Sequence, residues 1–500
     1  MLLCSLQVCE NDILLVDVVN RVPGQGFGIH WRGQHQKETP VMDGVPMVTQ
    51  LEKYIKLNSQ CILGVQLTDG IFGALIVRQS PRRDSQVKLY DVDDSSHVIV
   101  INEWSHGFAI QRLLEPNPGT STATLLINGR SHLQESDTVP TPLSTFTVSP
   151  GKRYRFRVAY AGGGRGCPIT IRVAGHVLRV IALDGNPIVP RERADFVLTA
   201  DQPVASYWLR VSTAEDCDSS VIKGTAILRY EGADVTEAIL PASSDLEPEA
   251  SSLTLLNTVD GHCTVPEEKG GSVCLPDVKS LHKIHKDLTE GKTDKTLYLG
   301  FGFKPLSGES TSYPPHPGKV NRVMVPQLNN LTFTFPPSPL LTQAEDLAPD
   351  LMCRKEAPPP RCQGSPICEC VHVIDLPLGA TVELILVDQG GSDSGHVFHL
   401  HGYSFYVVGV RQMDEATPLH TIQDLDKRGV LLQRNLVNPV LKDTVTVPSN
   451  GYWLLHDQHV SYWTNGLDVV FHVGNSDDVP PPPKDFPRCG SFVGPEFFLI

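Results

Sequence analysis

The stretch STFTVSPGKRYRFRVAY, residues 144–160, decides the fold class of this 500-residue chain. Apolar and polar residues alternate on both sides of the turn Ser149-Pro150-Gly151-Lys152. Such alternation is typical of β-strands that bury one face. The stretch therefore predicts two strands separated by a tight turn.

Similar patterns recur along most of the chain, for example DILLVDVVNR at residues 12–21 and GLDVVFHVG at residues 466–474. Short strands separated by turns are typical of β-sandwiches and barrels, so an all-β fold is predicted. PGKRYRFRV at 150–158 is echoed by LGATVELILV at 378–387, which indicates duplicated sandwich domains. Only HTIQDLDKRG, at 420–429, is expected to form a short helix.

Charge and hydropathy exclude two classes of partner. The formal net charge is −14 and the sequence pI is about 5.7. A negatively charged protein is repelled by nucleic acid and by anionic membranes, so neither is expected as its main partner. No run of eighteen apolar residues occurs, so no membrane span is expected.

The twelve cysteines bear on the compartment, because scattered cysteines in a chain this long favour disulfides and secretion over a zinc ribbon. The sequon Asn330-Leu331-Thr332 agrees with secretion and makes Asn330 a candidate glycosylation site. The start MLLCSLQVCE lacks the basic residues and the long apolar run of a signal peptide. We expect that a preceding segment is missing; the alternative is a cytosolic protein with free thiols.

Histidines gather in three segments: GIHWRGQH at 28–35, GHVFHLHGYSF at 395–405 and LLHDQH at 454–459. Strand alternation places His399 and His401 on one face, where their imidazoles can converge. Neutral imidazole is the usual protein ligand of copper and zinc. The alternative is that these histidines are satisfied by hydrogen bonds alone.

These segments carry a family resemblance. HVFHLHGYSFYVVG at 396–409 resembles the H-x-x-H-x-H-G segment of multicopper oxidases, and VVNRVPGQGFGIHWRGQHQKETPVMDGVPMVTQ at 18–50 resembles their first copper segment. The chain is most similar to arthropod laccase-like proteins, and among them to the insect multicopper oxidase-related proteins with degenerate copper sites. The resemblance covers nearly all of residues 6–474.

The resemblance implies three cupredoxin-like (plastocyanin-like) Greek-key β-sandwich domains, of which the first and parts of the others are truncated relative to the family. The expected division is 1–82 for an N-terminally truncated domain 1, 86–232 for domain 2, 233–295 for linker and loops, 296–475 for domain 3 and 476–500 for a Pro-rich tail. The family's reaction is one-electron oxidation of phenols or metal ions coupled to reduction of O₂ to water. That reaction uses four copper ions.

Carried over residue by residue, the family's ligand pattern is only partly kept. The resemblance assigns type 1 copper to His396, type 2 to His30 and His399, and type 3 to His401 and His456. Other ligand positions hold residues that do not match the pattern: Arg32, Gln60, Ile62, Asp457, Gln458 and Tyr462. Asp457 stands where the electron-relay cysteine is expected.

These departures predict a pseudoenzyme that binds an unknown protein or small-molecule ligand. The cysteines and the resemblance predict that it is secreted and extracellular. Copper is the family's cofactor, whereas here no metal, or at most one copper or zinc ion at His30, His399, His401 and His456, is expected. Two alternatives stay open: a copper-dependent oxidoreductase, and a mononuclear metal-binding protein.

Overall fold

In the computed structural model the chain forms two compact units. The described residues are 5–19, 28–50, 63–105, 107–109, 123–131, 142–163, 167–183, 192–213, 221–234, 278–280, 284, 286–289, 292–306, 323–354, 359–363, 365, 367–390, 396–411, 413, 417–442, 451–457, 466–484, 486 and 488–489.

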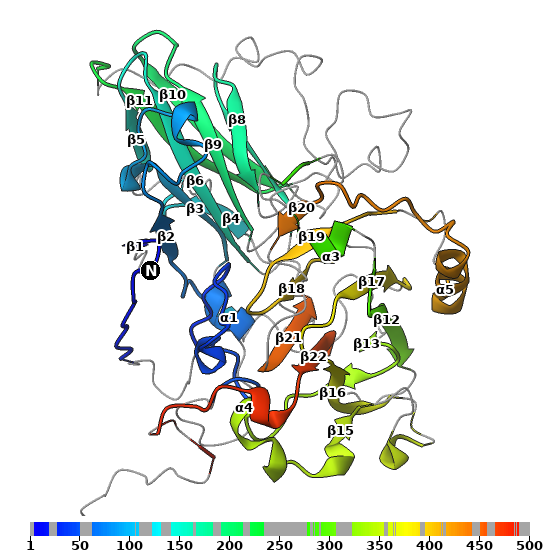
Figure 1. The fold of residues 1–500 in the computed structure, drawn as a ribbon. Coiled ribbons are helices and arrows are strands. Elements are labelled where there is room, and N and C mark those ends of the chain that lie inside the picture. Colours follow the sequence, from blue (N-terminus) through cyan, green and yellow to red (C-terminus); the bar gives the residue numbers. More distant parts are fainter. Residues whose placement is uncertain are drawn as a thin grey trace, which may run out of the picture. The chain divides into compact units, whose positions relative to one another are not determined.

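The first unit, Met1–Asp17 with Val65–Val278, is a β-sandwich (Figure 1). One sheet has the order β4-β3-β6-β9-β8: Ala123–Ile127, Val98–Ser105, Arg153–Gly162, Arg193–Thr199 and Leu178–Leu183. The other has the order β5-β11-β10-β7: Thr145–Val148, Lys223–Tyr230, Ser206–Thr213 and Ile169–Val173. A separate parallel pair joins β1 (Ser5–Cys9) to β2 (Ala74–Arg78).

Strand β6 shows why this sequence forms a sandwich. Its buried side chains alternate with partly exposed ones along all ten residues. Tyr154, Phe156 and Tyr160 enter one core together with residues of both sheets. On the opposite face, Arg155 donates from Nε to Asp195 at 2.8 Å. The alternation predicted from residues 144–160 is confirmed, with β5 and β6 placed in different sheets.

The second unit, Val18–Gly64 with Lys279–Ile500, is built on a larger sheet. Its order is β14-β16-β22-β21-β18, with β15 also paired to β16: Thr332–Phe333, Glu369–Leu376, Asp468–Val473, Gly451–Asp457, Phe398–Leu400 and, for β15, Met352–Cys353. A second sheet has the order β13-β12-β17: Val323–Leu328, Lys295–Leu306 and Val382–Asp388. Strands β19 (Phe405–Val407) and β20 (Val440–Lys442) form a pair.

The larger sheet of this unit is covered on both faces. Phe398, Leu400 and Leu455 pack against β12 residues such as Phe301 in one core. Val373 and Val470 belong to another core that contains Val45 and Val48 of the segment 28–50. The segment that carries His30 is therefore held by apolar packing within the unit that also contains β18 and β21.

Helices are few and short among the described residues: α1 (Leu63–Thr68), α3 (Lys286–Thr289), α4 (Leu340–Gln343) and α5 (Leu419–Lys427). Helix α5 confirms the helix expected near residue 420. Short 3₁₀ turns lie at Pro40–Met42, Val87–Leu89, Ser95–His97, Ala344–Asp346, Pro349–Leu351, Pro360–Cys362 and Ser476–Asp478. No described helix is long and apolar enough to cross a membrane.

The all-β prediction is confirmed by these sheets. The three-domain division stays a prediction, and most of the expected linker 233–295 lies outside the described residues. Strand β21 runs without interruption through Tyr452 and Trp453. It pairs there with β22 and, further along, with β18, so this strand has neighbours on both edges.

The core around Phe156 yields the first prediction. Phe156 is fully buried and its ring lies 5.2 Å from that of Phe196 and 5.8 Å from that of Phe146. We expect Phe156→Ala to lower the free energy of unfolding by about 3–5 kcal/mol, because the truncation leaves a cavity. The control, Val177→Ala at a 75% exposed side chain, should change it by less than about 0.5 kcal/mol. Urea denaturation followed by fluorescence measures both; equal effects of the two substitutions contradict the described core.

Candidate metal centre

Strand alternation sets the directions of the histidines in the second unit. Phe398 and Leu400 of β18 and Leu455 of β21 enter the core shared with β12. His399 lies between the two β18 core residues, and it pairs across the sheet with His456. Because successive side chains of a strand point to opposite faces, His399 and His456 lie on the face away from that core.

Three imidazoles meet on this face. One ring nitrogen from each of His30, His399 and His401 lies within 4.8 Å of the others. The Nε2 atoms of His30 and His399 are 3.0 Å apart, and the ring centroids of His30 and His401 are 3.9 Å apart. The His456 ring is 5.2 Å from that of His401. His399 and His401 converge as strand alternation predicted. His30, which the family resemblance had grouped with them, comes from a segment 369 residues away from His399.

Oxygen atoms of Asp43 and Asp457 contact the Nδ1 atoms of three of these rings. Nδ1 of His30 lies 2.9 Å from the carbonyl oxygen of Asp43 and 3.2 Å from its Oδ1. The other carboxylate oxygen of Asp43, Oδ2, lies 3.2 Å from Nδ1 of His401. Nδ1 of His456 donates to the carbonyl oxygen of Asp457 at 2.9 Å, in the tautomer that this network assigns. Partners of this kind orient metal-binding histidines through the nitrogen that does not bind the ion.

Burial keeps His399 and His401 uncharged at neutral pH. It lowers the pKa of His401 to about 4, with repulsion from His30 adding to the effect and Asp43 opposing it. Burial and the charge of Arg32 hold the pKa of His399 well below its ordinary value. For Asp43, burial raises the pKa, but the attraction of His401 and His30 outweighs it and the pKa falls below the ordinary range. At pH 7, His399 and His401 are thus neutral and lie close to the ionised carboxylate of Asp43.

His396 is separate from this cluster and has a different partner. Its Nδ1 donates to Oδ2 of Asp457 at 2.6 Å, and both side chains are 1% exposed. The rings of Phe301 and Phe303 lie 5.1 Å and 5.5 Å from the His396 ring. A buried carboxylate in apolar surroundings is costly unless it is paired, and His396 supplies that pair here.

Not every predicted position can be followed in the structure. Gln60, Ile62, Gln458 and Tyr462 lie outside the described residues. Arg32 is described, and its charge acts on His399 and His401. Asn330 is exposed in the turn between β13 and β14, and its glycosylation stays a prediction.

Two buried aspartates were not identified from the sequence. Asp43 precedes Gly44, whose φ is +80°, so the pair resembles an ordinary turn, and no local signal marks Asp43 as a partner of histidines. The sequence does contain a signal for Asp468, because this aspartate begins a strand whose other residues, except His472, are apolar. Burial and the charge of Asp457 raise the pKa of Asp468 well above its ordinary value.

Comparison with known proteins identifies similar sequences and folds. Sequence patterns described as Multicopper oxidase match residues 1–56, 95–233 and 334–475. The laccase of Phlebia radiata is 29% identical over 92% of this chain and 81% of its own length, and Laccase-4 of Arabidopsis thaliana is 26% identical over 96% and 89%.

Two solved structures share the fold at low sequence identity. The L499M mutant of the B. aclada laccase has a TM-score of 0.63 at 19% identity, covering 93% of this chain and 80% of that one. Fet3p, titled as a multicopper oxidase that functions in iron import, has a TM-score of 0.60 at 18% identity, with coverages of 96% and 87%. Both support the all-β, cupredoxin-like fold.

The electrostatics of the cluster predict a pH dependence. The pKa of His401 is about 4 in the folded state and about 6.5 in the unfolded state. Between these two pH values the unfolded state therefore binds more protons than the folded state. We therefore expect the metal-free protein to lose stability as the pH falls from about 6.5 towards 4. NMR titration of the His401 ring should place its midpoint near pH 4. A midpoint near 6.5 contradicts the buried, uncharged cluster.

Proposed function

Because the chain belongs to the multicopper oxidase family and has laccases among its relatives, we propose that it is a laccase-like pseudoenzyme. In this proposal the chain no longer reduces O₂ at four coppers and acts by binding a protein or a small-molecule ligand. The observation that carries the proposal is the hydrogen bond of 2.6 Å between His396 and Asp457.

The identity of Asp457 matters because of the chemistry of the electron-accepting copper. A blue type 1 site needs a cysteine thiolate beside two histidines, and the thiolate sets its redox behaviour. Asp457 offers a hard carboxylate oxygen instead, and that oxygen accepts a hydrogen bond from the His396 ring that would bind the copper. Without this copper the family's route for electrons from substrate to O₂ has no first acceptor.

The residue at position 32 also supports the loss of copper chemistry. By the family resemblance it stands at a type 3 ligand position, where a guanidinium cannot coordinate a metal ion. Its permanent charge already lowers the pKa of His399 and His401 by repulsion, and it would repel a copper ion by the same Coulomb effect. The loss at Asp457 and the loss at Arg32 are chemically independent.

The third prediction tests the loss of oxidase activity. After loading with copper, the protein should show no blue absorption band and no oxygen uptake with phenols or ferrous ion, because no thiolate is available at Asp457. Visible spectroscopy and an oxygen electrode measure both, with a fungal laccase as positive control. Copper-dependent oxygen uptake that His396→Ala removes would support the alternative, a copper oxidoreductase, and reject the proposal.

A second candidate function is favoured by the histidine cluster: binding of a single copper or zinc ion. His30, His399 and His401 would supply three nitrogens, and His456 a fourth. Two nitrogens bound to one tetrahedral ion at about 2.0–2.1 Å lie roughly 3.3 Å apart. The 3.0 Å between the Nε2 atoms of His30 and His399 requires only a small adjustment. Nδ1 of His399 has no hydrogen-bond partner among the described residues, so no second hydrogen bond fixes the orientation of this buried ring.

The fourth prediction tests this ion. The protein should retain about one equivalent of zinc or copper after mild dialysis, and His399→Ala should abolish retention. Asp43→Asn should weaken metal affinity by about 10–100-fold, because the carboxylate orients His30 and His401. Isothermal titration calorimetry and elemental analysis provide the measurements.

The control for the metal experiment is His35→Ala. His35 is exposed and its Nε2 contacts the Ser404 hydroxyl at 3.0 Å, away from the three-histidine group. Retention below about a tenth of an equivalent in the unaltered protein, or equal loss in the His35 and His399 variants, rejects a specific ion at this cluster.

Location outside the cell is part of the proposal. The described disulfides Cys353–Cys370 and Cys362–Cys368 support it, because disulfides persist in oxidising compartments. Exposure of Asn330 is compatible with a glycan there.

A further inference from the structure

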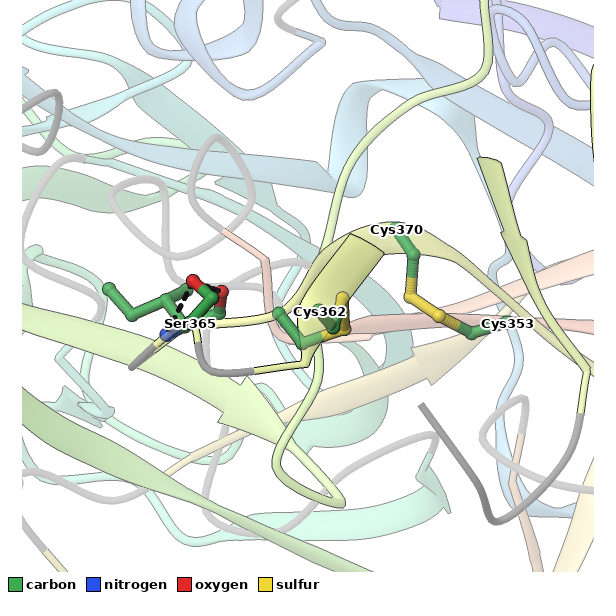
Figure 2. The surroundings of a disulfide bond; sticks show 6 residues. Cys353, Cys362, Ser365 and Cys370 are labelled. Carbon is green, nitrogen blue, oxygen red and sulfur yellow. Dashed lines mark hydrogen bonds between the residues drawn. A yellow bond between two sulfur atoms is a disulfide. The ribbon is translucent and has the colours of Figure 1, made fainter. Parts of the chain in front are cut away.

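Four cysteines form a compact group at the beginning of β16, in a part of the second unit that the histidine cluster does not use. Cys353 is bonded to Cys370, and Cys362 is bonded to Cys368 (Figure 2). Cys368 and Cys370 are buried, whereas Glu369 between them is exposed, as strand alternation requires. The two bonds therefore project from the same face of the chain.

The two disulfides lie next to each other. The sulfur atoms of Cys353, Cys368 and Cys370 are all within 4.8 Å of one another. Together with Leu331, the four cysteines form an apolar cluster of their own. One sulfur of the Cys362–Cys368 bond is thus close to both sulfurs of the Cys353–Cys370 bond.

The two bonds differ in exposure. Cys353 and Cys370 are 2% and 0% exposed, whereas Cys362 and Cys368 are 9% and 8% exposed. Cys362 ends the short turn Pro360–Cys362 and is followed by exposed Gln363. A thiol from solvent therefore reaches the Cys362–Cys368 bond, which we call the outer bond, before it reaches Cys353–Cys370, the inner bond.

We propose that this four-cysteine group is a thiol–disulfide exchange site for small thiols, in which an exchange begun at the outer bond passes to the inner bond. In the first step the thiolate of the small thiol attacks the sulfur of Cys362. A mixed disulfide forms there, the outer bond breaks, and Cys368 leaves as a thiolate.

In the second step the Cys368 thiolate attacks one sulfur of the inner bond. Attack on Cys353 forms a Cys353–Cys368 bond and releases Cys370 as a thiolate; attack on Cys370 releases Cys353 instead. The proton lost by the incoming thiol is returned to the cysteine that is released. One external thiol is consumed and one protein thiol appears, so no separate oxidant or reductant is needed.

The inner bond has a clear structural role, which gives the exchange a consequence. It links β15 to β16, where Met352 pairs with Val371 and Cys353 with His372. Strand β16 pairs with β22, and β22 with β21. A Cys353–Cys368 bond would attach β15 two residues earlier on the same face of the chain, so exchange changes how the edge of this sheet is held.

The experiment uses the full-length protein and glutathione as the small thiol. Free thiols, which among the described residues are Cys9 and Cys489, are first blocked with N-ethylmaleimide. After incubation with glutathione, acid quenching removes thiolates, isotopically labelled maleimide traps the released thiols, and peptic peptides are mapped by mass spectrometry. We expect glutathione on Cys362, and label on Cys353 or Cys370 in an amount comparable to that on Cys368.

A variant tests the second step without an external thiol. Cys362→Ser leaves Cys368 as a thiol beside the inner bond, so label should be distributed over Cys368, Cys353 and Cys370. In the matched control, Cys362→Ser with Cys368→Ser, the inner cysteines should stay unlabelled because no attacking thiol is present. Should Cys362→Ser fail to fold, the glutathione experiment on the unaltered protein decides alone. Label confined to Cys368, with the inner bond intact, overturns the proposal in either experiment.

Discussion

The period-two alternation of β18 and β21 is the constraint on which both the core and the candidate site depend. It sends Phe398, Leu400 and Leu455 into the core shared with β12 and leaves His399 and His456 on the opposite face. A shift of register by one residue would place the histidines among the core side chains and turn Phe398, Leu400 and Leu455 to the face on which the imidazoles now meet. The hydrophobic free energy of the core therefore also fixes the positions of the imidazoles.

Buried carboxylates determine what these imidazoles can do. Asp43 lies against Nδ1 of both His30 and His401, and it is ionised where burial keeps His401 neutral. Asp457 accepts a hydrogen bond from His396 in a buried position. An aspartate thus has two different effects. Asp43 orients the candidate metal ligands His30 and His401, whereas Asp457 engages His396 in a hydrogen bond.

In this family the fold tolerates substitution far better than the copper sites do. A cupredoxin-like framework is shared with laccases at about 19% sequence identity, since packing tolerates extensive substitution when volume and alternation are kept. Copper chemistry depends on a few donor atoms and is changed by single substitutions, so a shared fold does not by itself carry the activity. In the second unit, disulfides at the edge of the main sheet add covalent links to this framework.

Much of the fold was predictable from the sequence, because alternation and turn residues act locally: the strands around residues 144–160 and the short helix α5 are where the pattern placed them. The same local rule predicted that His399 and His401 share a face. The sequence by itself thus determined the all-β class, the separate histidine segments and the presence of aspartate at position 457. Only the tertiary structure decided that Asp43 lies between His30 and His401 and that the two disulfides lie side by side, because these contacts join segments whose separation in sequence carries no periodic signal.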